Sequence, residues 1–261
     1  MLSIRAHSME MRPRRGYFWM VMAAVFATSI WGTVRMCGSM SGSDMQMPGG
    51  WTMSMAWMRM PGQTWPGAFF SFLSMWTVMM VAMMLPCLAP VLADYRRRTA
   101  DAGVDTRAAL VGIGYFVTWA LIGMIAYAIG VPIAYAQMWH DSLSTPAPIA
   151  TAVIVVIAGA AQFTGWKRRL LDHCRRDDTC RPVLSTFGAF RYGLRLGVDC
   201  GKCCAGYMMI LLVTNVMSLP IMTALTVAIA AERLSPHPAL VARLTGAVTV
   251  VVGVVMLARV I

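Results

Sequence analysis

Charged residues are scarce in this chain, and their scarcity excludes most classes of soluble protein. Only 13% of the 261 residues are Asp, Glu, Lys or Arg, whereas 58% are hydrophobic. The apolar residues form blocks of about twenty, the length that a helix needs to cross a bilayer. The blocks also lack the alternation of polar and apolar residues that is typical of membrane β-barrel strands. We therefore predict an all-α, polytopic transmembrane helix bundle.

Seven apolar segments are candidate spans. They cover residues 17–34, 67–92, 108–130, 149–166, 198–215, 217–231 and 240–257. Only residues 215–220 interrupt the fifth and sixth segments, so the number of spans falls to six if this pair is partly re-entrant. Together with a basic N-terminal segment, 1–16, the pattern predicts one integral membrane domain over residues 17–261.

Acidic residues are half as frequent as basic ones, with 11 Asp and Glu against 22 Lys and Arg. The resulting net charge of +11 does not indicate nucleic-acid binding, because the basic residues cluster in alternate loops. This distribution follows the positive-inside rule. It predicts a multi-pass protein of the cell (inner) membrane with a cytoplasmic N-terminus. The same rule assigns residues 35–66 to an outer loop and residues 167–196 to a basic cytoplasmic loop, which we expect to lie at the anionic lipid leaflet.

The predicted outer side is almost free of cysteine, since Cys37 is the only one of seven that lies there. This distribution excludes a secreted disulfide framework, and the other thiols are expected to be reduced. The chain also lacks a nucleotide-binding loop and the phosphorylatable Asp motif of ion-pumping ATPases. Any transport would therefore be passive, ion-coupled or driven by a partner.

Three cysteines nevertheless stand together at the start of the fifth apolar segment. Cys200, Cys203 and Cys204 are three and four residues apart, which favours one face of a helix, and Met208 follows one turn later. Soft sulfur ligands of this kind bind Cu(I) or Zn(II). His173 and Cys174 in the cytoplasmic loop are further ligand candidates, although their spacing fits no zinc-finger pattern.

Methionine is in large excess, with 25 residues. The outer loop contains the Met-x-Met pairs Met45/Met47, Met53/Met55 and Met58/Met60. Its Gly, Ser and Pro content predicts a flexible segment without much of a core. Thioethers prefer Cu(I), so the loop favours copper over zinc. The alternative is a membrane-grazing loop, or a general preference for an adaptable apolar residue.

The second apolar segment carries a methionine stripe. Met75, Met79 and Met83 follow one another at intervals of four residues, and Met84 flanks them. Such a stripe is consistent with a soft cation passing between ligands, and equally with packing against helices and lipid. Near the end of the sixth apolar segment, Glu232 stands beside Arg233 and is interpreted as an interfacial pair partner.

These segments resemble a known family. The run Trp76-x-x-Met79-x-x-Ala82-Met83-Met84-x-Pro86-x-x-x-Pro90 is similar to the second-helix motif of the domain-of-unknown-function 2182 family, described as predicted metal-binding integral membrane proteins. Three further motifs follow in order: Gln162, Thr164, Lys167, His173, Cys174 and Arg175; Gly193, Gly197, Cys200, Cys203 and Cys204; and Asn215, Met217, Glu232 and Arg233. The resemblance runs from about residue 67 to residue 233 and implies metal binding without naming a metal, a reaction or a partner.

Three functions remain open at this point. The leading interpretation is a membrane protein that binds a soft metal, with Cu(I) favoured, for transport or for delivery to a membrane cuproenzyme or a soluble metallochaperone. The second is a membrane thiol–disulfide oxidoreductase that uses Cys200 and Cys203. The third is an accessory subunit of a membrane complex without chemistry of its own. The oligomeric state is not predicted.

Overall fold

The computed structural model describes residues 2–40, 45–47, 51–59, 62–99, 103–176 and 185–260. In chain order the elements are α1 (Leu2–Met40), β1 (Met45–Met47), β2 (Trp51–Met53), the 3-10 turn η1 (Met55–Trp57), α2 (Trp65–Arg98), α3 (Val104–Trp139), α4 (Asp141–Ser144), α5 (Ala147–Ala161), α6 (Gly165–Arg176), α7 (Thr186–Thr214), α8 (Leu219–Leu234) and α9 (Pro238–Val260). The predicted helical bundle is confirmed, with one small antiparallel hairpin added to it.

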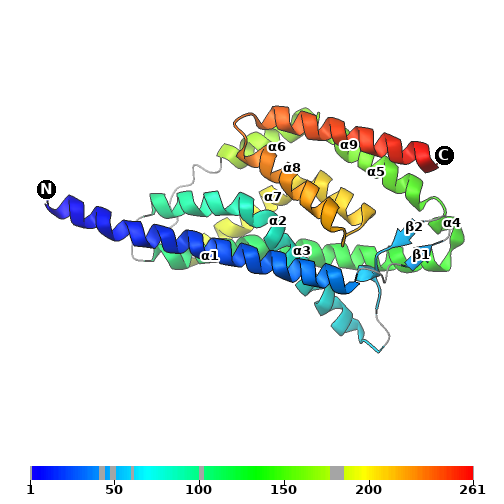
Figure 1. Cartoon of the computed structure of the whole chain (residues 1–261), viewed down its shortest axis with the longest axis horizontal. Coiled ribbons are helices and arrows are strands. Elements are labelled where there is room, and N and C mark those ends of the chain that lie inside the picture. Colours follow the sequence, from blue (N-terminus) through cyan, green and yellow to red (C-terminus); the bar gives the residue numbers. More distant parts are fainter. Residues whose placement is uncertain are drawn as a thin grey trace.

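The helices form a bundle in which α2 is central (Figure 1). In the most apolar part of α2, 67% of the residues are buried, against 17% in α1 and 17% in α9. In the view of Figure 1, α1 and α9 lie on opposite sides of the bundle, and the two chain termini lie at opposite ends. The outer helices therefore present the apolar surface that a lipid environment accepts, while α2 contributes most of the core.

Five helices are long and apolar enough to cross a membrane: α1, α2, α3, α7 and α9. A sixth span results if α5 and the first part of α6, which meet at an angle of 63°, are counted as one. The predicted seven spans are not confirmed. The missing one is α8, whose 16 residues extend roughly 24 Å, less than the hydrocarbon thickness of about 30 Å.

Helices α3 and α7 approach each other closely because glycines line their contact. A Cβ atom at Gly193 would lie 2.1 Å from the carbonyl oxygen of Val111, and one at Gly114 would lie 2.3 Å from that of Phe190. The Gly-x-x-x-Gly spacing thus lets the two backbones touch, as in other membrane helix pairs. This close contact sets the register of α3 against the cysteine-bearing part of α7.

The segment between α1 and α2 packs against the bundle through tryptophans. The Trp57 ring lies 5.2 Å from the Phe72 ring of α2, and it fills the space above Gly130 of α3. The indole Nε1 of Trp51 donates a hydrogen bond to the Ser144 carbonyl at 3.1 Å. Residues 51–58 therefore contribute two large aromatic rings to the bundle, which is more packing than was expected of this loop. The expected flexibility of the loop stays a prediction.

Candidate metal centre

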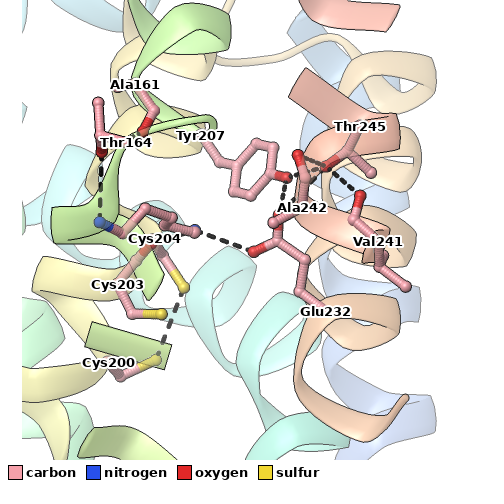
Figure 2. A network of polar contacts seen from close by, with 11 residues as sticks. Ala161, Thr164, Cys200, Cys203, Cys204, Tyr207, Glu232, Val241, Ala242 and Thr245 are labelled. Carbon is pink, nitrogen blue, oxygen red and sulfur yellow. Dashed lines mark hydrogen bonds and ion pairs between the residues drawn. The ribbon is translucent and has the colours of Figure 1, made fainter. Parts of the chain in front are cut away.

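Two thiols meet on the buried face of α7. The Sγ atoms of Cys200 and Cys204 are 3.9 Å apart (Figure 2), and the two residues are 0% and 2% exposed. The hydroxyl of Tyr115 on α3 donates a hydrogen bond to Cys200 Sγ at 3.0 Å. Two sulfurs that share one ion at about 2.3 Å lie roughly 3.8 to 4.6 Å apart, from tetrahedral to linear geometry. The pair therefore has the spacing of two ligands of one ion.

The third cysteine of the motif has different neighbours. Cys203 is buried against Leu171 of α6 and Ala242 of α9. Among the residues that the structure describes, no three His, Cys, Asp or Glu side chains are grouped so as to hold one metal ion. The structure thus brings together two of the three predicted thiols, and a ligand role for Cys203 stays a prediction.

The thiol pair belongs to a continuous buried cluster that is rich in sulfur. Its sulfur-containing members are Cys37, Met75, Met79, Met80, Met83, Met84, Cys87, Cys200, Cys204, Met208 and Met222. Met79, Met83 and Met84 are at most 2% exposed, so their side chains face the bundle interior rather than lipid. Packing between helices and a role as soft ligands both remain compatible with this position.

A positive charge lies near the thiol pair. Arg233 of α8 and Cys87 of α2 are within electrostatic range of Cys200. Two thiolates that bind one Cu(I) ion carry a net charge of −1, and a buried charge requires a counter-charge. The candidate counter-charges are Arg233 of α8 and Lys167 of α6, and Lys167 is also paired with Glu232.

A buried polar network adjoins the thiols (Figure 2). The Nζ atom of Lys167 lies 2.9 Å from Glu232 Oε2 and donates a hydrogen bond to the Cys203 carbonyl at 2.8 Å. The hydroxyl of Tyr207 donates to Glu232 Oε1 and lies 2.8 Å from Thr245 Oγ1. The network ties α6, α7, α8 and α9 together beside the Cys200–Cys204 pair.

The position of Lys167 follows from the break between α5 and α6. The Thr164 hydroxyl accepts a hydrogen bond from the Lys167 backbone N–H at 3.3 Å, which caps α6 at its start. The helix axis turns there by 63°, and the lysine side chain points inward, with the residue only 5% exposed.

Lys167 and Glu232 both differ from the sequence prediction. The whole basic loop, 167–196, was expected at the lipid surface, and this was wrong for Lys167. Glu232 was expected at an interface, yet it is 2% exposed. Its partner is Lys167, which lies 65 positions earlier in the chain. The signal that pointed to the lysine was its place in the Gln162–Thr164–Lys167 motif.

The remaining predicted ligands are not tested. His173 and Cys174 belong to α6, but their side chains lie outside the described part of the structure. Residues 177–184, with Cys180, lie outside it entirely. In the hairpin, Met45 is the backbone partner of Met53, Met47 ends β1 and Met55 begins η1. Their side chains are likewise not described, so a ligand role for these methionines stays a prediction.

One family model matches the chain. It is PpoB2, described as copper chaperone, and it matches residues 73–256. No curated protein and no solved structure matches the chain. The matched model shows a copper-related family, which agrees with the predicted preference for copper. It does not carry the domain-of-unknown-function 2182 label. The matched residues include the methionine stripe, the thiol pair and the polar network.

Proposed function

We propose, from the premise that the chain belongs to the PpoB2 family of copper chaperones, that it binds Cu(I) inside a membrane helix bundle and delivers it to a partner protein. The copper ion is cargo in this proposal, held for transfer. Five helices of suitable length and apolarity support the membrane location. The partner would be a membrane cuproenzyme or a soluble metallochaperone.

The observation that carries the proposal is the Cys200–Cys204 pair. Its sulfur atoms are 3.9 Å apart and buried, which suits a soft ion without bound water. Structural zinc sites use four ligands, whereas Cu(I) accepts two or three soft donors. Met208, one turn beyond Cys204 and only 5% exposed, is the nearest candidate along α7 for a third donor.

The methionines of α2 support delivery in addition to storage. Met79, Met83 and Met84 share the buried cluster with both thiols. Thioethers bind Cu(I) without needing to lose a proton, so a bound ion can move between them by exchange of neutral ligands. The proposed route leads from the outer loop, through this stripe, to the thiol pair.

Thiol–disulfide exchange is less well supported. The attacking sulfur of such an enzyme must reach the disulfide of its partner, but Cys200 and Cys203 are 0% and 3% exposed. Cys200 also lies beside Cys204, the residue that the oxidoreductase interpretation left without a role. Burial of all three thiols is therefore unfavourable for direct attack on the disulfide of a partner protein.

The test is copper binding by the purified full-length protein in detergent under reducing conditions. Copper content is measured by mass spectrometry, and affinity is measured by competition with a Cu(I)-specific chelator. Replacing both thiols (Cys200→Ser with Cys204→Ser) is expected to remove one bound ion. Substitution of residues that only support a metal ligand weakens metal affinity about 10–100-fold. Loss of both ligands should weaken copper affinity by more than this.

The matched control is Cys203→Ser on the same helix, whose thiol packs outside the pair and which should retain the ion. A double variant with wild-type copper content and affinity would refute the proposed site. Wild-type protein that binds no copper would favour the accessory-subunit alternative.

A further inference from the structure

A second pair of sulfur atoms lies far from the first in the sequence. The thiol of Cys37, near the end of α1, is 4.0 Å from the thioether sulfur of Met217, in the turn between α7 and α8. The two residues are 180 positions apart. Cys37 is 5% exposed and forms no disulfide. The contact joins α1, a peripheral helix, to the end of the helix that carries the thiol pair.

Two hydrogen bonds to Asn215 define the turn that holds Met217. Helix α7 ends at Thr214, and the side-chain Oδ1 of Asn215 then accepts a hydrogen bond from the Met217 backbone N–H at 2.9 Å. The Asn215 carbonyl accepts a second one from Ser218 N–H at 3.2 Å. Val216, the residue between Asn215 and Met217, is fully buried. The thioether therefore meets Cys37 from a turn that is supported by hydrogen bonds, as the ligands of a preformed site are.

We propose that Cys37 and Met217 form a second binding site for a soft monovalent cation, occupied by Cu(I). Their separation of 4.0 Å falls within the roughly 3.8 to 4.6 Å expected for two sulfurs on one ion. The charge also fits. One thiolate and one Cu(I) ion form a neutral complex, which needs no counter-charge in an apolar interior, whereas a divalent ion would leave a buried charge of +1. The Cys200–Cys204 pair differs because two thiolates with one Cu(I) ion would carry a net charge of −1.

The position of this site suggests the order in which an ion meets the two sites. The Phe18 ring of α1 lies 4.5 Å from the Arg96 guanidinium at the end of α2. Cys37 lies 19 residues further along the same helix, or roughly 28 Å toward the other end of the bundle. The methionine-rich segment follows directly in the chain. The Cys37–Met217 site is thus a first binding site next to that segment in the chain. Cys37 belongs to the same buried cluster as the α2 methionines and the thiol pair, and Met217 packs against this cluster.

The inference rests on the proposed function only for the identity of the ion. Cys37 precedes residues 73–256, which the copper-chaperone family model matches, whereas Met217 lies within them.

The main experiment isolates Cys37 in the full-length chain. The six other cysteines, Cys87, Cys174, Cys180, Cys200, Cys203 and Cys204, are replaced by Ser, and Cu(I) or Ag(I) is titrated against a competing chelator. We expect one bound ion, and an affinity that falls at least about tenfold in Met217→Leu. The matched control is Met209→Leu, a methionine of α7 that is 46% exposed and should leave the affinity unchanged. Equal affinities in the two variants, or no bound ion, would overturn the inference.

A second experiment in the wild-type background covers the case in which the six substitutions prevent folding. Wild type should bind two Cu(I) ions. Cys37→Ser should bind one, Cys200→Ser with Cys204→Ser should also bind one, and the triple variant none. A Cys37→Ser protein that keeps both ions contradicts the second site. The second site is also contradicted if wild type binds a single ion, and if this ion is lost in Cys200→Ser with Cys204→Ser but kept in Cys37→Ser. That result leaves the proposed function intact.

Discussion

The thiol pair and the polar network occupy neighbouring turns of α7, yet their bonding differs. In the network, Lys167 Nζ has both a carboxylate and a carbonyl as partners, and both oxygens of Glu232 are bonded. In the thiol pair, Cys200 receives one hydrogen bond, from Tyr115, and otherwise faces Cys204. Burial is nearly the same in both regions.

The difference separates a structural role from a binding role. A buried group whose bonding capacity is filled stabilises one arrangement of helices and has nothing left for a ligand. Two thiols whose only mutual contact is a weak S–H···S hydrogen bond can exchange that proton for a soft ion. Changes in the network should therefore act mainly on stability, whereas changes around the thiols should act mainly on copper affinity.

The largest effect is expected from Lys167→Met, which leaves the Glu232 carboxylate buried without its partner. Removing one member of a buried ion pair costs about 3–5 kcal/mol of the free energy of unfolding. Denaturation in mixed detergent micelles, followed by circular dichroism, measures this.

The matched control for this change is Lys202→Met. The Lys202 side chain is 56% exposed and lies 3.4 Å from Asp199, so its loss should cost about 0–1 kcal/mol. Adding Glu232→Leu to Lys167→Met should restore much of the stability, because both charges are then gone. Similar destabilisation by the two lysine variants would contradict a structural role for the network.

An intermediate effect is expected from Gly197→Ala. The new Cβ atom would lie 2.7 Å from the Thr118 Cβ and 2.9 Å from the Tyr115 carbonyl oxygen, which forces α3 and α7 apart at a cost of about 1–3 kcal/mol. Copper affinity should fall with it, because Tyr115 moves relative to Cys200.

The same substitution at Gly201, also on α7, is the control. Its Cβ atom would meet only the flexible end of Ile122, at 3.1 Å, and the change should be neutral or slightly stabilising. If Gly197→Ala unfolds at the same denaturant concentration as Gly201→Ala, the glycine contact does not position α3.

The smallest effect on stability is expected from Tyr115→Phe. It removes one hydrogen bond, worth about 0.5–1.5 kcal/mol, without changing the packing of the ring. Because the lost hydroxyl orients a ligand, copper affinity should nevertheless fall about tenfold. Tyr127→Phe, further along α3, serves as the control, and the chelator competition assay measures both. A Tyr115→Phe variant with wild-type affinity would show that the hydroxyl does not support the thiol pair.

Local spacing predicted part of the candidate site. The interval of four residues between Cys200 and Cys204 places them on one helix face, and their sulfurs are indeed adjacent. The intervals along α2 likewise placed Met79 and Met83 on one stripe, and that stripe is buried. Cys203, only one residue from Cys204, packs in another direction, because consecutive helix positions point about 100° apart.

Contacts between helices could not be read in the same way. Lys167 is followed by two arginines and has the composition of a solvated loop, so its burial depends on a helix bend that composition does not reveal. The Cys37–Met217 contact joins residues 180 positions apart. The apolar run 217–231 predicted a membrane span. In the structure it forms α8, whose 16 residues are too few to cross the hydrocarbon layer.

The sequence by itself determined the helical character of the chain, the apolar segments long enough to cross a membrane and the positions of the sulfur-containing residues on each helix. These features follow from hydrophobic length and from a repeat of 3.6 residues, which are properties of one segment at a time. Only the tertiary structure decided which sulfurs meet, which lysine is buried and where α7 ends. These depend on how closely α3 and α7 approach at their glycines and on the bend between α5 and α6, and such packing is shared among residues distant in the chain.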